Sequence, residues 1–291
     1  MDKNILITGA NGQLGNEFNS IKENYPEFNF IFVTKEELNI TDNTKVIDFL
    51  DNNSINYLIN CAAYTAVDNA EENTDLAHSI NVEGPELLAK ACNKIGAILL
   101  HVSTDYVFDG KNNDLYNEED KTSPLSVYGK TKLLGEIAIK ANCKVHYIIR
   151  TSWLYSTFNS NFVKSMLKLA ETRNELGIVA DQFGSPTYAK DLAKAIMTLI
   201  KKTDNGSVKN QFGVYHYSNE HVTTWCDFAK EIMTLAKTNC IVKPITTEEY
   251  PVPAPRPKNS SMSKEKIKST FKLTIPKWED SLRTCLNELL K

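Results

Sequence analysis

Short apolar runs alternate with amphipathic stretches along the first half of the chain. Each apolar run predicts a buried strand, and the stretches between them place apolar residues at helical spacing. Regular alternation of strands and helices is typical of a parallel sheet covered by helices on both faces, so the pattern predicts an α/β, doubly wound fold. The predicted strands are residues 4–8, 29–33, 57–61, 97–102 and 145–150, and predicted helices include 44–50, 75–95 and 126–140.

The alternation becomes less regular after about Arg150. The segment 246–263 contains four prolines, which predicts an extended or looped path. We therefore expect a nucleotide-binding lobe over residues 1–150 and a smaller, mainly substrate-binding lobe over 151–291, with some later segments returning to the first lobe. The cleft between two such lobes is the expected binding site.

A glycine-rich loop follows the first predicted strand. Gly9, Gly12 and Gly15 are spaced as G-x-x-G-x-x-G and lead into an amphipathic helix. Glycine permits a tight turn and close backbone approach, and the start of a helix offers free N–H groups to a pyrophosphate. In this strand–loop–helix setting the loop predicts a dinucleotide site, with an ordinary strand-to-helix turn as the alternative.

Three polar residues form the candidate catalytic set. Tyr128 and Lys132 are four residues apart and would share one face of a helix. A nearby ammonium lowers the pKa of a phenol, which can then act as a general acid or base. Thr104 ends the apolar stretch 98–104, at the strand end where ligands bind in doubly wound sheets. His101 lies within that strand and is expected to be packed.

Taken together, these segments resemble the extended short-chain dehydrogenase/reductase superfamily, with a Rossmann-type sheet. Within it, the chain is most similar to the dTDP-4-dehydrorhamnose reductase family. The similarity extends over nearly the whole chain and includes the strings at residues 103–110, 150–155, 181–187 and 256–260.

The resemblance implies the last step of dTDP-rhamnose biosynthesis, reduction of the C4 keto group of dTDP-4-dehydro-β-L-rhamnose to dTDP-L-rhamnose. It implies that Tyr128 supplies the proton, while Lys132 lowers the pKa of Tyr128 and holds the nicotinamide ribose. Thr104 would position the carbonyl. The hydride comes from the cofactor, so the protein supplies orientation and electrostatics.

For the cofactor, the resemblance implies contacts across the glycine loop and the next two strand ends. Asn39 stands where the family usually has Asp. No acid directly follows the second strand, and Lys35 could attract a 2′-phosphate, which favours NADPH with NADH tolerated; a solvated surface lysine explains Lys35 equally well. Besides Tyr128 and Lys132, the implied contacts are Gly9, Asn11, Gly12, Gln13, Leu14, Lys35, Asn39, Ile40, Ala62, Ala63 and Thr65.

For the dTDP-sugar, the resemblance implies pocket aromatics and an arginine near the diphosphate. Arginine suits that group because it can bind phosphate oxygens in a bidentate manner. Trp153 could equally belong to the core. The implied substrate residues are Val67, Asp68, Thr104, Tyr106, Trp153, Asn161, Phe162, Gln182 and Arg256.

Composition narrows the remaining classes. With 42% hydrophobic and 24% charged residues, the 291-residue chain is typical of a globular protein. A net charge of −3 argues against nucleic acid as a partner, and no apolar run reaches the ~20 residues of a membrane span. Six scattered cysteines without C-x-x-C spacing predict free thiols in a reducing cytoplasm, without zinc.

One departure from the family concerns magnesium. Some members dimerise around a shared Mg²⁺ held by glutamates. Glu17 matches one of these positions, Lys190 stands at another, and no C-terminal acid is recognisable. Lysine is a poor partner for Mg²⁺, so we expect no metal and either a monomer or a weak homodimer that is not metal-bridged.

Two alternatives remain open from sequence. A sugar-nucleotide dehydratase or epimerase could share this fold, but dehydratases need an acid pair after the threonine, and Tyr106 follows Asp105 here. A non-catalytic regulatory subunit, similar to that of methionine adenosyltransferase, is the second. The intact Thr104, Tyr128 and Lys132 argue against it, and a turnover assay separates the two.

Overall fold

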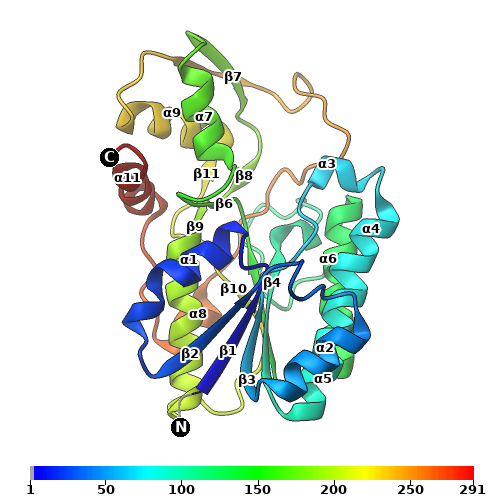
Figure 1. Cartoon of the computed structure of the whole chain (residues 1–291). Helices are drawn as coiled ribbons and strands as arrows, with labels where there is room; N and C mark the ends of the chain where they lie inside the picture. Colours follow the sequence, from blue (N-terminus) through cyan, green and yellow to red (C-terminus); the bar gives the residue numbers. More distant parts are fainter. Residues whose placement is uncertain (1–2) are drawn as a thin grey trace.

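A computed structural model describes residues 3–291 and is built on a six-stranded parallel sheet (Figure 1). This confirms the predicted doubly wound α/β fold. From one edge to the other, the strands are β2 (Phe28–Val33), β1 (Lys3–Thr8), β3 (Ile55–Asn60), β4 (Ile98–Thr104), β5 (His146–Thr151) and β10 (Gly213–His216).

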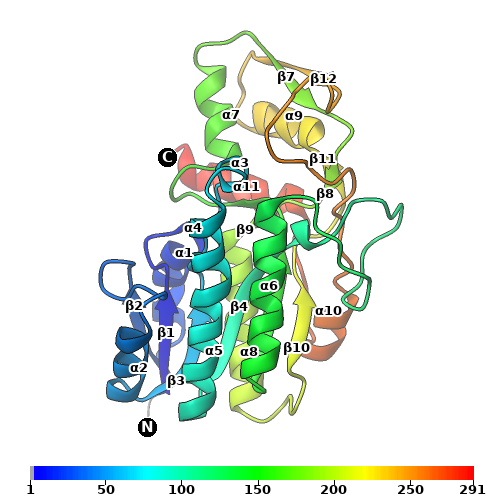
Figure 2. The ribbon, with the colours of Figure 1, turned by 90° about the vertical axis from the view of Figure 1, so that its right-hand side faces the viewer.

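Helices cover both faces of this sheet (Figures 1 and 2). In β1, Ile5 and Ile7 pack on one face while Leu6 packs on the other, and all three are fully buried. Burial on both faces explains why these strands read as continuous apolar runs. One face holds α1 (Gln13–Ile21) and α8 (Ala189–Asp204); the other holds α2 (Asn43–Asn52), α5 (Gly84–Ile95) and α6 (Val127–Asn142).

The helix predicted over 75–95 is interrupted. The structure has α4 (Thr74–His78), a π-helical turn over Ser79–Glu83, and then α5. A π turn closes hydrogen bonds one residue further along than an α-helix does, which displaces the side chains within it. Asn81, in that turn, is 1% exposed and contributes to the site below.

The strand β10 was not predicted from sequence. It pairs in parallel with β5, placing His216 opposite Arg150. Four residues are too few to show a clear period, and the strand lies where the alternation had become irregular. The later segments β10, α8 and α10 (Glu265–Phe271) therefore pack with the sheet built mainly by residues before 150.

A second group of elements lies beyond the carboxyl ends of the strands (Figure 1). Its core packs Tyr155, Phe228 and Trp278. It contains α7 (Phe162–Ala170), α9 (Trp225–Leu235), α11 (Trp278–Leu289) and the parallel pair β7 (Glu175–Val179) and β12 (Ile241–Ile245). Shorter elements are α3 (Val67–Ala70), β6 (Leu154–Tyr155), β8 (Phe183–Gly184), β9 (Thr187–Tyr188), β11 (Thr223–Thr224) and 3₁₀ turns at Lys22–Asn24 and Asp105–Val107.

Two further expectations, on the proline-rich segment and on the cysteines, can be compared with the structure. The proline-rich segment 246–263 has isolated bridges but no helix or strand, as predicted. All six cysteines are free. Within residues 3–291, none of the helices combines the length and apolar character needed to cross a membrane.

Candidate active site

The glycine loop between β1 and α1 is closely packed against the end of β3. Gly9 has φ +66°, and a side chain there would place its Cβ 2.8 Å from the backbone N of Ala62. A Cβ at Gly15 would lie 2.5 Å from the carbonyl oxygen of Gly9. Glycine is therefore required both for the turn and for the approach of α1 to the loop.

The start of α1 has unused hydrogen-bonding capacity. Gly12 is the N-cap residue and provides no side-chain cap, and the first turn contains no acid. The Oε1 atom of Gln13 is buried without a partner. Free N–H groups at a helix start favour a phosphate, so these residues suit the pyrophosphate of a dinucleotide.

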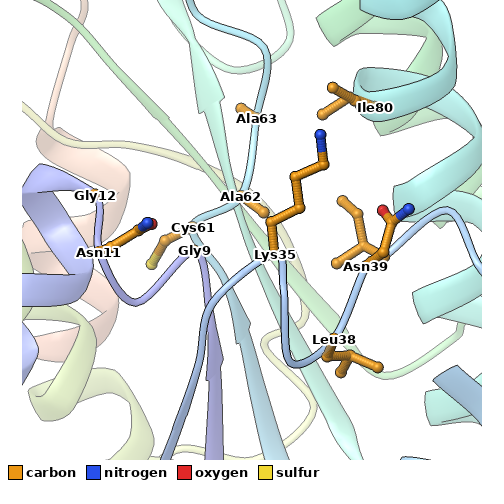
Figure 3. Close-up of a pocket in the computed structure, with 11 residues that line it drawn as sticks. Gly9, Asn11, Gly12, Lys35, Leu38, Asn39, Cys61, Ala62, Ala63 and Ile80 are labelled. Atoms are coloured by element: carbon orange, nitrogen blue, oxygen red, sulfur yellow. The ribbon is translucent and has the colours of Figure 1, made fainter. Parts of the chain in front are cut away.

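A pocket continues from this loop across the ends of β1, β2 and β3 (Figure 3). Of the predicted cofactor residues, five do not line it, and Leu14 belongs to the core; these five are Gln13, Leu14, Thr65, Tyr128 and Lys132. Predicted residues that line it are Gly9, Asn11, Gly12, Lys35, Asn39, Ile40, Ala62 and Ala63; Leu38, Cys61 and Ile80 were missed. Apolar side chains in these three positions looked like ordinary core or loop residues in the sequence.

Thr104 and Tyr128 lie together at the carboxyl end of β4. The Thr104 hydroxyl donates to Oδ1 of Asp105 at 3.1 Å and accepts from the N–H of Tyr106 at 3.2 Å. Burial raises the pKa of Tyr128 to about 12, while the neighbouring Thr104 hydroxyl acts in the opposite direction. The rings of Tyr106 and Tyr128 meet edge to face at 5.7 Å.

Lys132 is buried one helical turn beyond Tyr128. Its Nζ lies 2.7 Å from the carbonyl oxygen of Val102 and 3.1 Å from Nε2 of His101. Burial lowers the pKa of Lys132 to about 8, although Glu136 and Cys61 act to raise it. The sequence led us to expect that Lys132 lowers the pKa of Tyr128, but the pKa of that phenol is raised because burial dominates.

The start of α6 is fixed at three points. Ser126 caps the helix by accepting from the N–H of Gly129 at 3.2 Å. A Cβ at Gly129 would lie 2.3 Å from the carbonyl oxygen of Tyr106, so only glycine lets the helix approach that loop. Asn81 donates to the Thr131 hydroxyl at 3.1 Å and bonds both backbone groups of Tyr64.

A buried ion pair fixes the middle of α6 to β5. Arg150 Nε and Nη2 donate to the two carboxylate oxygens of Glu136 at 3.0 and 2.8 Å. Ser103 also donates to Glu136 at 2.6 Å. Arg150 and Glu136 are 2% and 0% exposed, so the string beginning at Arg150 has a structural role that sequence alone did not reveal.

Two predicted substrate residues pair with each other. Arg256 donates through Nη2 to Oδ2 of Asp68 at 2.8 Å, and the N–H of Ala254 donates to the other oxygen of Asp68. This joins the proline-rich segment to α3. Val67 begins α3 and is only partly buried.

The remaining predicted substrate residues lie in the second lobe. Trp153 stacks on Trp225 with ring centroids 3.7 Å apart and packs against Gly184, and Phe162 contacts the same Trp225 ring. Asn161 caps α7 by accepting from the N–H of Lys164.

Gln182, the last of the predicted substrate residues, is 7% exposed and donates to the Thr247 hydroxyl at 3.2 Å. Asn161 and Gln182 both make hydrogen bonds within the chain. Their contacts with the substrate remain predictions.

The position suspected for magnesium contains a lysine between acids. Lys190 Nζ lies 2.9 and 3.0 Å from the two carboxylate oxygens of Glu288 on α11. Glu17 is fully buried, accepts from Ser156 at 2.7 Å, and has its pKa raised by burial. The expectation that no C-terminal acid reaches this place was wrong. Within residues 3–291, no cluster of three or more His, Cys, Asp or Glu side chains could hold a metal ion.

Comparisons with known proteins agree with this geometry. Residues 3–291 match the family described as RmlD substrate binding domain. A dTDP-4-dehydrorhamnose reductase of Sinorhizobium fredii is 37% identical, over 98% of this chain and 97% of that protein. A crystal structure of a dTDP-4-dehydrorhamnose reductase from Clostridium acetobutylicum superposes with a TM-score of 0.94 at 41% identity, over 99% of this chain and 100% of that one. A homologue from Bacillus anthracis, solved in complex with NADP, gives 0.92 at 38% identity, over 99% and 100%.

Proposed function

The chain belongs to the RmlD substrate binding domain family, and on this basis we propose that it reduces the C4 keto group of dTDP-4-dehydro-β-L-rhamnose to dTDP-L-rhamnose with NADPH. The observation that supports this most is the Tyr128 phenol beside the Thr104 hydroxyl at the end of β4. The relatives described above are reductases by name, which favours a reductase over a regulatory subunit, a dehydratase or an epimerase.

In the proposed reaction, a bound nicotinamide supplies hydride to the carbonyl carbon. Tyr128 supplies the proton to the oxygen that becomes negative. With a pKa near 12, the phenol holds its proton at neutral pH until such an oxyanion forms beside it. The Thr104 hydroxyl orients the carbonyl by hydrogen bonding once its proton turns from Oδ1 of Asp105 to the substrate oxygen, and a donor in that place stabilises the developing charge.

We propose that the dTDP-sugar binds between a lobe formed mainly by residues 1–150 and one formed mainly by 151–291. Arg256 is the cation proposed for the diphosphate. Its pairing with Asp68 at 2.8 Å means that a diphosphate would compete with that carboxylate for the guanidinium. Trp153 and Tyr106 supply the aromatic surface for the sugar.

The proposed activity is tested by following NADPH oxidation with dTDP-4-dehydrorhamnose generated in situ. We expect oxidation that depends on the sugar nucleotide and yields dTDP-L-rhamnose, identified by mass and NMR. A folded protein that binds NADPH but does not turn over this substrate would support the regulatory-subunit alternative instead.

Lys35 is the proposed source of cofactor selectivity. It lies in the cofactor pocket, extended toward the side formed by Asn39 and Ile80 (Figure 3). The carboxylate of Glu37 lies just after β2, where it accepts from the N–H of Thr34 at 2.7 Å. The sequence did not suggest this contact. An exposed charge pair contributes about 1 kcal/mol or less, so we expect only a severalfold preference for NADPH in kcat/KM, decreasing with added salt.

Lys35→Glu should reverse this preference toward NADH, measured as the ratio of the two kcat/KM values. Lys45→Glu, an exposed lysine on α2 outside the pocket, makes the same charge change and should leave the ratio unchanged. A wild-type preference for NADH, or an unaltered ratio in Lys35→Glu, would show that selectivity lies elsewhere.

We propose a monomer or weak homodimer without a bridging metal, acting in the cytoplasm. Lys190 already provides the positive charge between Glu288 and the region of Glu17. Treatment with EDTA should therefore leave the molecular mass in solution unchanged, as measured by light scattering. A dimer that dissociates on chelation and reforms with Mg²⁺ would contradict this assembly.

A further inference from the structure

The Lys132 amino group lies against β4. Its two hydrogen-bonding partners there are the carbonyl oxygen of Val102 and Nε2 of His101. Lys132 and His101 are each 1% exposed. Solvent therefore does not determine the protonation of this pair, and the neighbouring protein groups must do so.

Asn60, at the end of β3, determines which nitrogen of His101 carries the proton. Its Oδ1 accepts from the N–H of Ala62 at 3.1 Å and from the Thr8 hydroxyl at 2.7 Å. Because a backbone N–H can only donate, the amide oxygen must face Ala62. The amide nitrogen then faces Nδ1 of His101 at 3.0 Å, and since it is a donor, Nδ1 must accept.

A neutral imidazole that accepts at Nδ1 carries its proton on Nε2. That N–H points at Lys132 Nζ. An ammonium has no lone pair, so a charged Lys132 would leave two donors facing each other in a buried site. A neutral amine accepts from His101 and still donates to Val102.

We propose that Asn60 and His101 favour the neutral amine of Lys132 before ligands bind, so that this lysine loses its proton at a lower pH than a free lysine does, which makes His101 a positioning residue for the charge of Lys132. The consequence of this protonation state for catalysis rests on the proposed reductase function. Because the ammonium of Lys132 is disfavoured, it does little to favour a phenolate, and Tyr128 keeps its proton until cofactor and substrate are in place.

The other groups around Lys132 agree with this assignment. Glu136, one turn further along α6, has both oxygens engaged by Arg150, with Ser103 also bonded to one of them. Burial raises the pKa of the Cys61 thiol to about 12 and lowers that of His101 well below its usual value, so both are neutral at neutral pH. The pKa of Lys132 itself is lowered by burial.

The test titrates Lys132 directly, by NMR of protein labelled with [ε-¹³C]lysine, with Lys132→Met identifying the resonance by its loss. We expect the wild-type midpoint at least about one pH unit below the ~10.4 of a free lysine. In Asn60→Asp, a carboxylate oxygen of residue 60 accepts from the Nδ1–H of His101. The Nε2 atom of His101 then becomes an acceptor for the ammonium of Lys132. The Lys132 midpoint should then rise by at least about one pH unit.

Asn142→Asp, at the end of α6 and away from Lys132, adds the same charge and should not move that midpoint. A second measurement needs no variant: ¹⁵N shifts of the histidine ring should show His101 neutral with its proton on Nε2. A Lys132 that titrates with the surface lysines, a folded Asn60→Asp without a shift, or a proton on Nδ1 of His101 would each overturn the inference. Both NMR readouts are independent of turnover, so an inactive protein with a low Lys132 midpoint would refute only the proposed function.

Discussion

Tyr128→Phe is expected to reduce kcat of the proposed reduction by at least ~10²-fold, the usual scale of general acid catalysis. Phenylalanine keeps the ring and its edge-to-face contact with Tyr106 at 5.7 Å, but has no proton to donate. NADPH binding should be retained, since the pocket of the glycine loop does not include this side chain. Steady-state kinetics and NADPH fluorescence measure the two effects separately.

Tyr25→Phe is the matched control, because it removes a phenol in the loop before β2, where the ring contacts Lys201 and not the site. It should leave kcat unchanged. Near-normal turnover in a folded Tyr128→Phe variant would remove Tyr128 from the mechanism. A loss of NADPH binding together with turnover would instead indicate a structural defect.

The second large effect concerns stability. Glu136→Gln should destabilise the protein by about 3–5 kcal/mol, the usual cost of leaving one charge of a buried pair uncompensated. Glutamine keeps the shape of the side chain, but the Arg150 guanidinium, 2% exposed, loses its counter-charge. Urea unfolding followed by circular dichroism measures the change in the free energy of unfolding.

An exposed ion pair, Lys94 with Asp51, provides the comparison for the buried pair. The two charged groups are 2.7 Å apart, and their side chains are 59% and 42% exposed. Asp51→Asn should change the free energy of unfolding by about 1 kcal/mol or less. If Glu136→Gln proved as mild as Asp51→Asn, the buried pair would not be what fixes α6 to β5.

The sheet was predictable because its strands are buried on both faces, and such burial requires continuous apolar runs like the one at residues 4–8. The strand β10 was missed because it is four residues long and lies where the alternation had become irregular. Tyr128 and Lys132 were predictable as a pair because helix geometry alone relates residues four apart.

The surroundings of the candidate site required the structure. His101 lies 31 residues before Lys132, and nothing in the spacing of the two indicates that their nitrogens are 3.1 Å apart. Similarly, Lys190 and Glu288 are 98 residues apart and meet only because α11 returns to α8. The raised pKa of Tyr128 depends on burial, which a sequence motif does not contain.

The π-helical turn at Ser79–Glu83 makes the length of this segment as important as its composition. In this turn, Asn81 forms hydrogen bonds with Tyr64, which follows β3, and with Thr131 on α6. Deleting one residue would restore a regular α-helix and remove the displacement that lets Asn81 reach both partners. Homologues that conserve this bridge should therefore vary in sequence between α4 and α5 while admitting neither insertions nor deletions there.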